Sequence, residues 1–250
     1  MHKHSKVALV MASVLALSTA APAFAADTAP VKQSEAAKQQ ELVTQARYTA
    51  QRFADDPGIE WVRRNVGTVK GVFIMPEQIK GAFMFGGAGG NGVMLAHKED
   101  GSWSYPAFYG TGQVSFGFQA GGQVSELVLL IMTEKGLNAF KNTSLKLGAD
   151  ISVAAGPVGA GAKAATADVL AFSRQKGLYG GVSIEGTGIT ALNDWNAAYY
   201  GKNVTPAEIL FGKAVSNSSA EPLRQAVAAL STPRQTTGSL EPSNRAERPN

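Results

Sequence analysis

Cysteine is absent from this 250-residue sequence, and histidine occurs only three times, at His2, His4 and His97. Without cysteine the chain can form no disulfide, so an ordinary hydrophobic core has to stabilise the fold. The same absence, together with so few histidines, almost excludes a closed zinc site, whose usual ligands are thiolates and imidazoles. No D-x-D-x-D-G calcium loop is present either. We therefore predict neither a metal site nor any other cofactor.

Groups suited to acid–base or nucleophilic catalysis are few. His2 and His4 lie in a predicted signal peptide, which leaves His97, beside a predicted hairpin turn, as the one histidine of the mature chain. No G-x-S-x-G elbow supplies a nucleophile for it. The S-x-x-K run at residues 173–176 lacks the S-D-N and K-T-G companions of penicillin-recognising enzymes. We predict no catalytic residue and expect the protein not to be an enzyme.

Two glycine-rich segments look like nucleotide-binding motifs but lack the required context. The G-x-G-x-x-G pattern at residues 87–92 precedes a predicted strand, whereas the dinucleotide fingerprint needs a helix whose N-terminus holds the pyrophosphate. The phosphate-loop-like run at residues 156–163 places Ala162 between its last glycine and Lys163. Neither segment is predicted to bind a nucleotide.

The longest apolar run near the start, residues 7–17, is too short to span a bilayer stably. It follows Lys3 and Lys6 and precedes the small-x-small cleavage pattern at residues 23–25. We predict a signal peptide at residues 1–25 and an exported protein, periplasmic or secreted, with no membrane span. Because no cysteine follows the apolar run, a lipid anchor is not expected either.

The mature chain has little net charge. Without Lys3 and Lys6, the 23 basic residues fall to 21 against 19 acidic ones. A dedicated nucleic-acid-binding protein normally carries a concentrated basic surface, so no nucleic-acid partner is expected.

The remaining sequence predicts a linker at residues 26–33, one domain at 34–230 and a disordered tail at 231–250, which has three prolines and no aromatic residue. Residues 34–54 form a predicted helix that begins at Ser34. Its apolar residues recur at three- and four-residue steps and form one stripe. They are Leu42, Ala46, Ala50 and Phe53.

The middle of the chain is glycine-rich and has strong β patterns. Of the 28 glycines, 24 lie between Gly67 and Gly188. Short strands are expected at 68–75 and 80–85, split by Pro76, and Asp100-Gly101 is a strong hairpin signal. The fold class is therefore α+β: a β-rich single domain, with a curled sheet or partly closed barrel and flanking helices.

Residues 144–155 alternate apolar and small or polar side chains, which is typical of a strand with one buried face. Because this strand would be unusually long, a bend is expected at Gly148. Gly156-Pro157 would end it.

Five segments occur in a characteristic order: GGNGV at 89–93, DGSWSYP at 100–106, LGAD with AAGPVG at 147–150 and 154–159, GLYGGVSIEG at 177–186, and YYG at 199–201. Together they resemble the SYLF domain, the lipid-binding family that includes the yeast Las17-binding actin regulators. The resemblance extends over residues 34–212, nearly the whole mature chain.

That resemblance implies a non-enzymatic phospholipid-binding protein, here of the bacterial cell envelope. It also implies that an amphipathic N-terminal helix contacts the membrane, and residues 34–53 occupy the matching place. Actin binding by eukaryotic relatives is not expected of an exported chain, which also lacks a Src-homology-3 module. The alternative is a structural or protein-interaction module of the envelope, with an envelope protein as its partner and no lipid ligand.

Two groups of residues are candidate lipid contacts. The first comprises Lys38, Arg47, Tyr48, Arg52, Arg63, Arg64 and Lys70. The second, beside the Gly-Pro turn, comprises Lys163, Arg174 and Lys176. Residues 35–70, the stretch that contains the first group, carry a net charge of only about +1. Geometry therefore decides whether this stretch attracts anionic lipid.

On a helix, Arg52 and Tyr48 share a face, whereas Arg47 projects about 100° away from Tyr48. Anchoring would require Leu42, Tyr48 or Phe53 to enter the bilayer interface. Alternatively, Leu42 and Phe53 pack on the β core and the arginines are solvated.

Overall fold

The structure is a computed structural model that describes residues 29–82, 86–115, 121–158, 166–175, 177–213 and 215–231. The predicted signal peptide lies outside the described residues, as do residues 26–28 of the predicted linker and 232–250 of the predicted tail.

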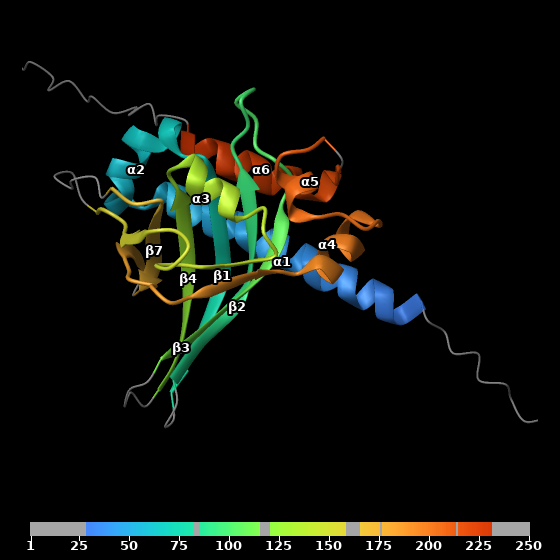
Figure 1. The fold of residues 1–250 in the computed structure, drawn as a ribbon, viewed down its shortest axis with the longest axis horizontal. Helices are drawn as coiled ribbons and strands as arrows, with labels where there is room; N and C mark the ends of the chain where they lie inside the picture. Colours follow the sequence, from blue (N-terminus) through green and yellow to red (C-terminus); the bar gives the residue numbers. More distant parts are fainter. Residues whose placement is uncertain are drawn as a thin grey trace, which may run out of the picture.

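Among the described residues, a curled nine-stranded sheet forms the centre of the fold (Figure 1). Its order is β5-β9-β3-β2-β1-β4-β7-β6, and β8 pairs with β7. The strands are β1 (Gly71–Ala82), β2 (Gly86–Ala96), β3 (Ala107–Ser115), β4 (Gly121–Ile131), β5 (Ser144–Lys146), β6 (Val153–Ala155), β7 (Val169–Gln175), β8 (Leu178–Gly181) and β9 (Gly188–Ala191). The β6–β7 pair is parallel, and the other pairs are antiparallel. The half-barrel with flanking helices confirms the predicted fold class.

Helices cover both faces of the sheet. The α-helices are α1 (Ala29–Asp55), α2 (Glu60–Asn65), α3 (Glu134–Ala139), α4 (Asn193–Tyr200), α5 (Pro206–Leu210) and α6 (Glu221–Ala228). Short 3-10 turns lie at Pro57–Ile59, Val66–Thr68, Ser218–Ala220 and Ala229–Ser231. The helices α1 and α6 pack together on one face, and α3 lies on the other (Figure 1).

The central strands bury both of their faces. Val72 and Ile74 of β1 point into the core beneath α1, whereas Phe73 and Met75 point into the core beneath α3 and α5. All of the side chains from Leu127 to Ile131 on β4 are buried in the same alternating way. Burial on both faces explains why β4 is an almost continuous apolar run.

The first helix carries the predicted apolar stripe but starts earlier than expected. Leu42, Ala46, Ala50 and Phe53 are all buried in the core. The helix begins at Ala29, so residues 29–33 are helical and not a linker, and Ser34 lies inside the helix. Capping preferences are modest in energy, so a helix with good formers upstream can extend past a potential cap.

The sequence predicted that Pro76 separates two short strands, and this prediction is wrong. The strand β1 runs through the proline, with an irregular register between Ile74 and Ile79 against β2 and between Met75 and Gln78 against β4. A bulge accommodates the missing N–H of proline without ending the strand. The facing strand β2 is glycine-rich because space is short: a Cβ on Gly90 would lie 2.3 Å from the carbonyl oxygen of Glu77.

The predicted long strand at residues 144–155 is wrong. The structure has two short strands, β5 and β6, joined by a turn in which Gly148 adopts φ +83° and its N–H donates to the carbonyl of Ile151. Leu145, Leu147 and Ile151 are nevertheless all buried in one core. The alternation of apolar and polar residues therefore predicted the buried side chains correctly. It did not predict the strand, because a segment that contains a turn can bury the same side chains.

Elements with strong local signals are confirmed. The Asp100-Gly101 turn joins β2 to β3, although β3 begins only at Ala107, and Gly101 has φ +79°. The sequence Thr-Pro-Ala-Glu at 205–208 is typical of a capping box, and Thr205 and Glu208 form one at the start of α5. A glycine is also typical of a helix end, and Gly201, at φ +67°, ends α4.

Candidate functional site

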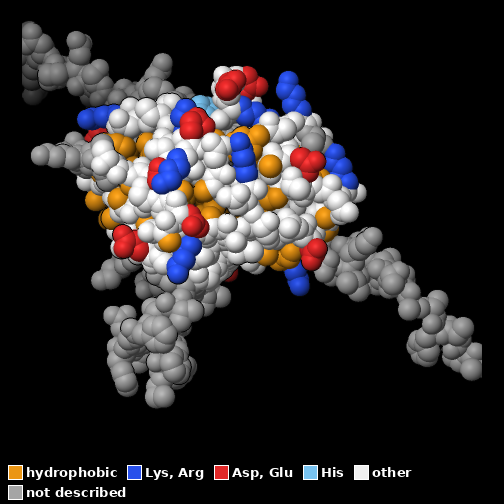
Figure 2. Space-filling view, in the orientation of Figure 1, with side chains coloured by type: hydrophobic (Ala, Val, Ile, Leu, Met, Phe, Trp, Pro, Cys, Tyr) orange, Lys and Arg blue, Asp and Glu red, His pale blue; other side chains and the backbone are white. Residues whose placement is uncertain are grey.

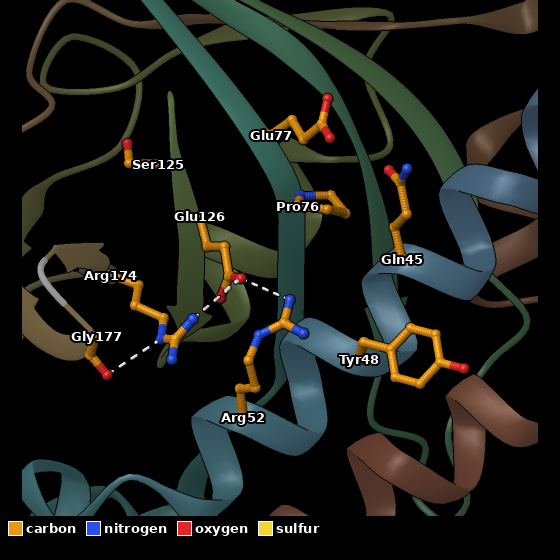
Figure 3. Close-up of a pocket in the computed structure, with 9 residues that line it drawn as sticks. All are labelled: Gln45, Tyr48, Arg52, Pro76, Glu77, Ser125, Glu126, Arg174 and Gly177. Atoms are coloured by element: carbon orange, nitrogen blue, oxygen red, sulfur yellow. Dashed lines mark hydrogen bonds and ion pairs between the residues drawn. The ribbon is translucent and has the colours of Figure 1, made fainter. Parts of the chain in front are cut away.

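A cavity of about 410 Å³ lies between α1 and the sheet (Figure 3). Its wall is formed by α1, by β1 at its irregular point, by β4 and by the β7–β8 turn. The lining residues are Gln45, Tyr48, Arg52, Pro76, Glu77, Ser125, Glu126, Arg174 and Gly177. We call it the α1 pocket. It combines two guanidinium groups, two carboxylates and an exposed aromatic ring.

Glu126 is the centre of a charged cluster in the α1 pocket. Its Oε1 lies 2.5 Å from Nη2 of Arg52 and 3.8 Å from Nη1 of Arg174. The hydroxyl of Tyr179 donates to its other oxygen. In Figure 3 the Glu126 carboxylate lies between the two arginines, while Glu77 lies away from them. One carboxylate thus holds two cations at one end of the pocket.

Strand pairing positions this cluster. Glu126 on β4 lies directly opposite Arg174 on β7, and Arg174 in turn lies opposite Tyr179 on β8. Arg52 comes from the last turn of α1. Three neighbouring strands and one helix therefore bring the four side chains together.

Tyr179 is a fixed donor beneath Glu126. Its ring packs edge-on against Phe53, with the ring centroids 4.9 Å apart. Burial, and then the hydrogen bond to Glu126, raises the pKa of the Tyr179 hydroxyl well above its ordinary value. The hydroxyl therefore keeps its proton throughout the physiological range.

A second hollow of about 290 Å³ continues along α1 and shares Gln45 and Glu77 with the α1 pocket. Lys38 lines this second hollow, together with Glu41 and Trp195. Lys38 is therefore exposed beside the α1 pocket, on the same side of the helix as Gln45.

Arg47 and Tyr48 are neighbours in space as well as in sequence. The Arg47 guanidinium carbon lies 4.5 Å from the centroid of the Tyr48 ring. The expectation that Arg47 projects away from Tyr48 is thus wrong at the level of the side chains, because the long arginine stem reaches back. Tyr48 is 47% exposed and lines the α1 pocket.

Three residues of the first predicted group have structural partners outside the α1 pocket. Arg63 donates from Nη1 to the carbonyl oxygens of Ala54 and Asp56, at 2.9 Å each, and so caps the end of α1. Arg64 forms an ion pair with Glu60. Lys70 lies 3.0 Å from Glu134 at the start of α3.

The two predicted groups meet in one site. Arg52 belongs to the first group and Arg174 to the second, yet both contact Glu126. Lys163 and Lys176, the other two residues of the second group, lie outside the described residues.

Glu126 and Tyr179 were not singled out from the sequence. A signal for Glu126 existed, since it is the one charged residue in the apolar run at 124–132. A lone carboxylate in a strand buried on both faces needs partners. Nothing in the sequence identified those partners, because they come from β7, β8 and α1.

The apolar side of α1 is not available for insertion into a bilayer. Leu42 is 9% exposed and Phe53 is fully buried, so of the three expected anchors only Tyr48 reaches the surface. On the face shown in Figure 2, basic and acidic side chains are interspersed and do not gather into one basic patch. That face therefore offers no concentrated basic surface to an anionic membrane.

Other kinds of site find little support in the described parts of the chain. Within the described ranges, no group of three or more His, Cys, Asp or Glu residues is placed to hold a metal ion. His97 stacks on Trp103, with the ring centroids 4.8 Å apart. Among the helices of the described ranges, none is both long and apolar enough to cross a membrane.

Comparison with known proteins supports the resemblance seen in the sequence. Protein YSC84 of Saccharomyces cerevisiae is 34% identical over 153 residues, which cover 58% of this chain and 33% of the yeast protein. LAS seventeen-binding protein 3 of the same species shows the same identity and coverage. SH3 domain-containing YSC84-like protein 1 of Homo sapiens is 32% identical over 164 residues, covering 63% of this chain and 48% of the human protein.

The chain thus spans about a third to a half of the length of the curated relatives it matches. No solved structure matches it. Residues 112–230, which include β4, β7 and β8 of the α1 pocket, match the family described as Ysc84, Las17-binding protein actin regulator. The SYLF resemblance is confirmed over residues 112–230, which are similar to the Ysc84 family.

Proposed function

We propose that this protein is a non-enzymatic, exported protein of the bacterial cell envelope that binds anionic phospholipid at the α1 pocket. The observation that carries the proposal is the convergence of Arg52 and Arg174 on one cavity that opens beside the exposed ring of Tyr48. Arginine binds phosphate through its planar fork of N–H donors. Tyrosine is favoured at membrane interfaces, where one end of the side chain is apolar and the other is hydrated.

The proposal places the contact at the pocket rather than along the apolar stripe of α1. Arg52, Arg174 and Tyr48 form its centre, and Arg47 and Lys38 lie next to it. The remaining residues of the first predicted group are Arg63, Arg64 and Lys70. They contact other residues of the protein, and we assign them structural roles. The binding domain is residues 34–230, extended at its start by the earlier residues of α1.

Sedimentation with vesicles tests this function. The mature chain should pellet with phosphatidylglycerol vesicles at low salt, remain in the supernatant with phosphatidylcholine vesicles, and dissociate as salt is raised. The double variant R52Q/R174Q should lose most of the binding, whereas R64Q, which removes a charge outside the pocket, should retain it. Absence of binding to anionic vesicles at low salt would remove the proposal.

A second candidate function is protein interaction through the same surface. It is favoured by the names of the relatives, which include a LAS seventeen-binding protein and a family of actin regulators. For this chain the partner would be another envelope protein, since actin is not expected outside the cytoplasm. Failure of vesicle binding by a folded chain would leave this candidate as the better one.

A further inference from the structure

The Glu126 carboxylate already occupies the place that an anionic ligand would take. It bridges Arg52 and Arg174, the two cations of the α1 pocket, at 2.5 and 3.8 Å. Its side chain is only 14% exposed, while those of Arg52 and Arg174 are 40% and 34% exposed. The carboxylate therefore lies at the bottom of the site, and the arginines reach from it toward the opening of the cavity.

The two arginines are held unequally. Arg52 makes a close ion pair with Glu126 and a 3.2 Å hydrogen bond to the hydroxyl of Thr49. Arg174 donates a hydrogen bond from Nε to the carbonyl oxygen of Gly177 at 3.2 Å. Its Nη1 lies 3.8 Å from Oε1 of Glu126, which is a longer contact than that of Arg52. Because a guanidinium group has five N–H donors, each arginine has more donors than these contacts use. Both can turn donors toward a second anion.

We propose that Glu126 is a built-in counter-anion of the α1 pocket, and that a phosphate group binds there by replacing it between Arg52 and Arg174. The inference deepens the proposed function and rests on it for the source of the phosphate. While Glu126 pairs with both arginines, the cluster carries one net positive charge. Once the arginines turn from Glu126, they offer two guanidinium groups to a doubly charged phosphate. Bidentate arginine–phosphate pairing is among the strong charge-assisted hydrogen bonds.

Tyr179 makes the replacement feasible. Its hydroxyl donates to the Glu126 oxygen that does not face Arg52. When the arginines turn to a ligand, the carboxylate keeps this donor and is not left wholly unpartnered, which would be costly in a buried place. The replacement thus exchanges one anion for another at two cations, with the displaced anion still bonded to the protein.

The test replaces each of the two carboxylates of the α1 pocket, Glu126 and Glu77, by the neutral amide of glutamine. Inorganic phosphate is titrated calorimetrically into the wild-type chain, E126Q and E77Q at matched ionic strength. The E126Q variant should bind phosphate about tenfold more tightly than the wild type, since the competing charge is removed beside the arginines. The E77Q variant makes the same change of net charge at the far end of the pocket and should stay within about twofold.

Several results would overturn the inference. Equal or weaker phosphate binding by E126Q would show that Glu126 organises the arginines instead of competing with the ligand. An equal gain in E77Q would show that only overall charge matters. The gain of E126Q should also vanish in R52Q/E126Q, and a gain that persisted would place the phosphate elsewhere.

A measurement on the wild-type protein tests the inference even if the E126Q variant does not fold. The side-chain Nε–H signals of Arg52 and Arg174 in nuclear magnetic resonance spectra should shift on addition of phosphate, while that of Arg64 should not. If E126Q fails to fold, unshifted Arg52 and Arg174 signals overturn the inference and shifted ones support it.

The source of the phosphate is separated from the mechanism by a vesicle arm. Stronger binding of E126Q to phosphatidic acid vesicles, in parallel with inorganic phosphate, would identify a lipid headgroup as the ligand. Binding of inorganic phosphate without any vesicle binding would support the counter-anion role of Glu126 but reject the proposed lipid function. Vesicle binding without phosphate binding would support the lipid function but reject the counter-anion role.

Discussion

The carboxylate of Asp56, just after α1, accepts a 2.8 Å hydrogen bond from the backbone N–H of Tyr179 on β8. Its other oxygen accepts from the N–H of Gly58 at 2.7 Å, and the residue is only 6% exposed. The contact joins segments 123 residues apart. It ties the end of the helix that carries Arg52 to the strand that carries Tyr179, so it braces the α1 pocket from below.

Replacing Asp56 by alanine should therefore be costly. The change leaves two buried or half-buried N–H groups without their acceptor, and we expect it to lower the free energy of unfolding by about 2–4 kcal/mol. Chemical denaturation of D56A beside the exposed-site variant E99A measures the loss. A decrease below about 0.5 kcal/mol would show that water replaces the carboxylate without penalty.

A second prediction concerns Gly156, which directly follows β6 and lies close to β7. A Cβ on Gly156 would lie 2.2 Å from the nearest ring atom of Phe172, which is fully buried. The ring cannot retreat within a packed core, so G156A should destabilise the protein by about 1–3 kcal/mol or more. Gly180 on β8 has open space where its Cβ would be, and G180A is the matched control. Equal melting temperatures for the two variants would contradict the prediction.

Asp168 gives a prediction about acid stability. The hydroxyl of Thr133 donates to one oxygen at 2.6 Å, and both the N–H and the hydroxyl of Ser152 donate to the other. These bonds, that from Thr133 first, lower the pKa of Asp168 to about 2, against partial burial, which raises it. A lowered folded-state pKa means that the carboxylate stabilises the fold above its unfolded pKa of about 4 and that this stability is lost as pH falls through about 2.

The variant D168N checks the sign. At pH 7 it should be less stable than the wild type by about 1–3 kcal/mol, because the amide nitrogen would face the Ser152 donors. The difference between the two proteins should shrink between about pH 4 and pH 2 as the wild-type carboxyl is protonated. A difference that stayed constant across that range would reject the role of ionised Asp168.

The sequence predicted best what is decided within a few residues. The capping box of Thr205 and Glu208, the Gly201 helix end and the Asp100-Gly101 turn all depend on neighbours in the chain. Residues 144–155 failed because alternation states only which side chains are buried. Leu145 reaches the core from a strand, whereas Leu147 and Ile151 reach the same core as the two partners of an isolated bridge. Only the partner strands β7 and β9 determine that arrangement.

The candidate site shows the same limit. Arg52 and Arg174 were identified from charge alone, in two separate groups, because they are 122 positions apart in the numbering. Their meeting on Glu126 depends on the register of β4 against β7 and on the packing of α1 over both. The burial of Leu42 and Phe53 likewise follows from the sheet that α1 covers, since an amphipathic stripe fits a core as well as a bilayer.

Arg63 and Arg64 allow structural and binding roles to be separated. Arg63 caps two carbonyls at the end of α1, while Arg64 pairs with Glu60 on an exposed surface. We expect R63Q to lower the free energy of unfolding by about 1–2 kcal/mol and R64Q by less than about 0.5 kcal/mol. Vesicle binding per folded molecule should be unchanged in both. Weaker binding by R64Q at full stability would extend the lipid contact beyond the α1 pocket.

The last prediction concerns Tyr48 as the one aromatic anchor left at the pocket. Its ring is 47% exposed and carries the Arg47 guanidinium on its face at 4.5 Å. At a membrane, the ring can enter the interface while the guanidinium meets headgroups. The variant Y48S should therefore weaken binding to phosphatidylglycerol vesicles about three- to tenfold, since an interfacial aromatic ring contributes of the order of 1 kcal/mol. Because the ring is not in the core, the melting temperature should change little.

Phe211 provides a matched control for Tyr48. It is a 39% exposed aromatic residue that also has a cation on its face, with Nζ of Lys141 at 4.3 Å, but it lies at the end of α5 and does not line the α1 pocket. The variant F211S should bind vesicles like the wild type, and Y48F should retain most of the affinity. If Y48S and F211S weaken binding equally, the contact is a general effect of exposed aromatic rings; if only F211S does so, the membrane-facing side lies at α5.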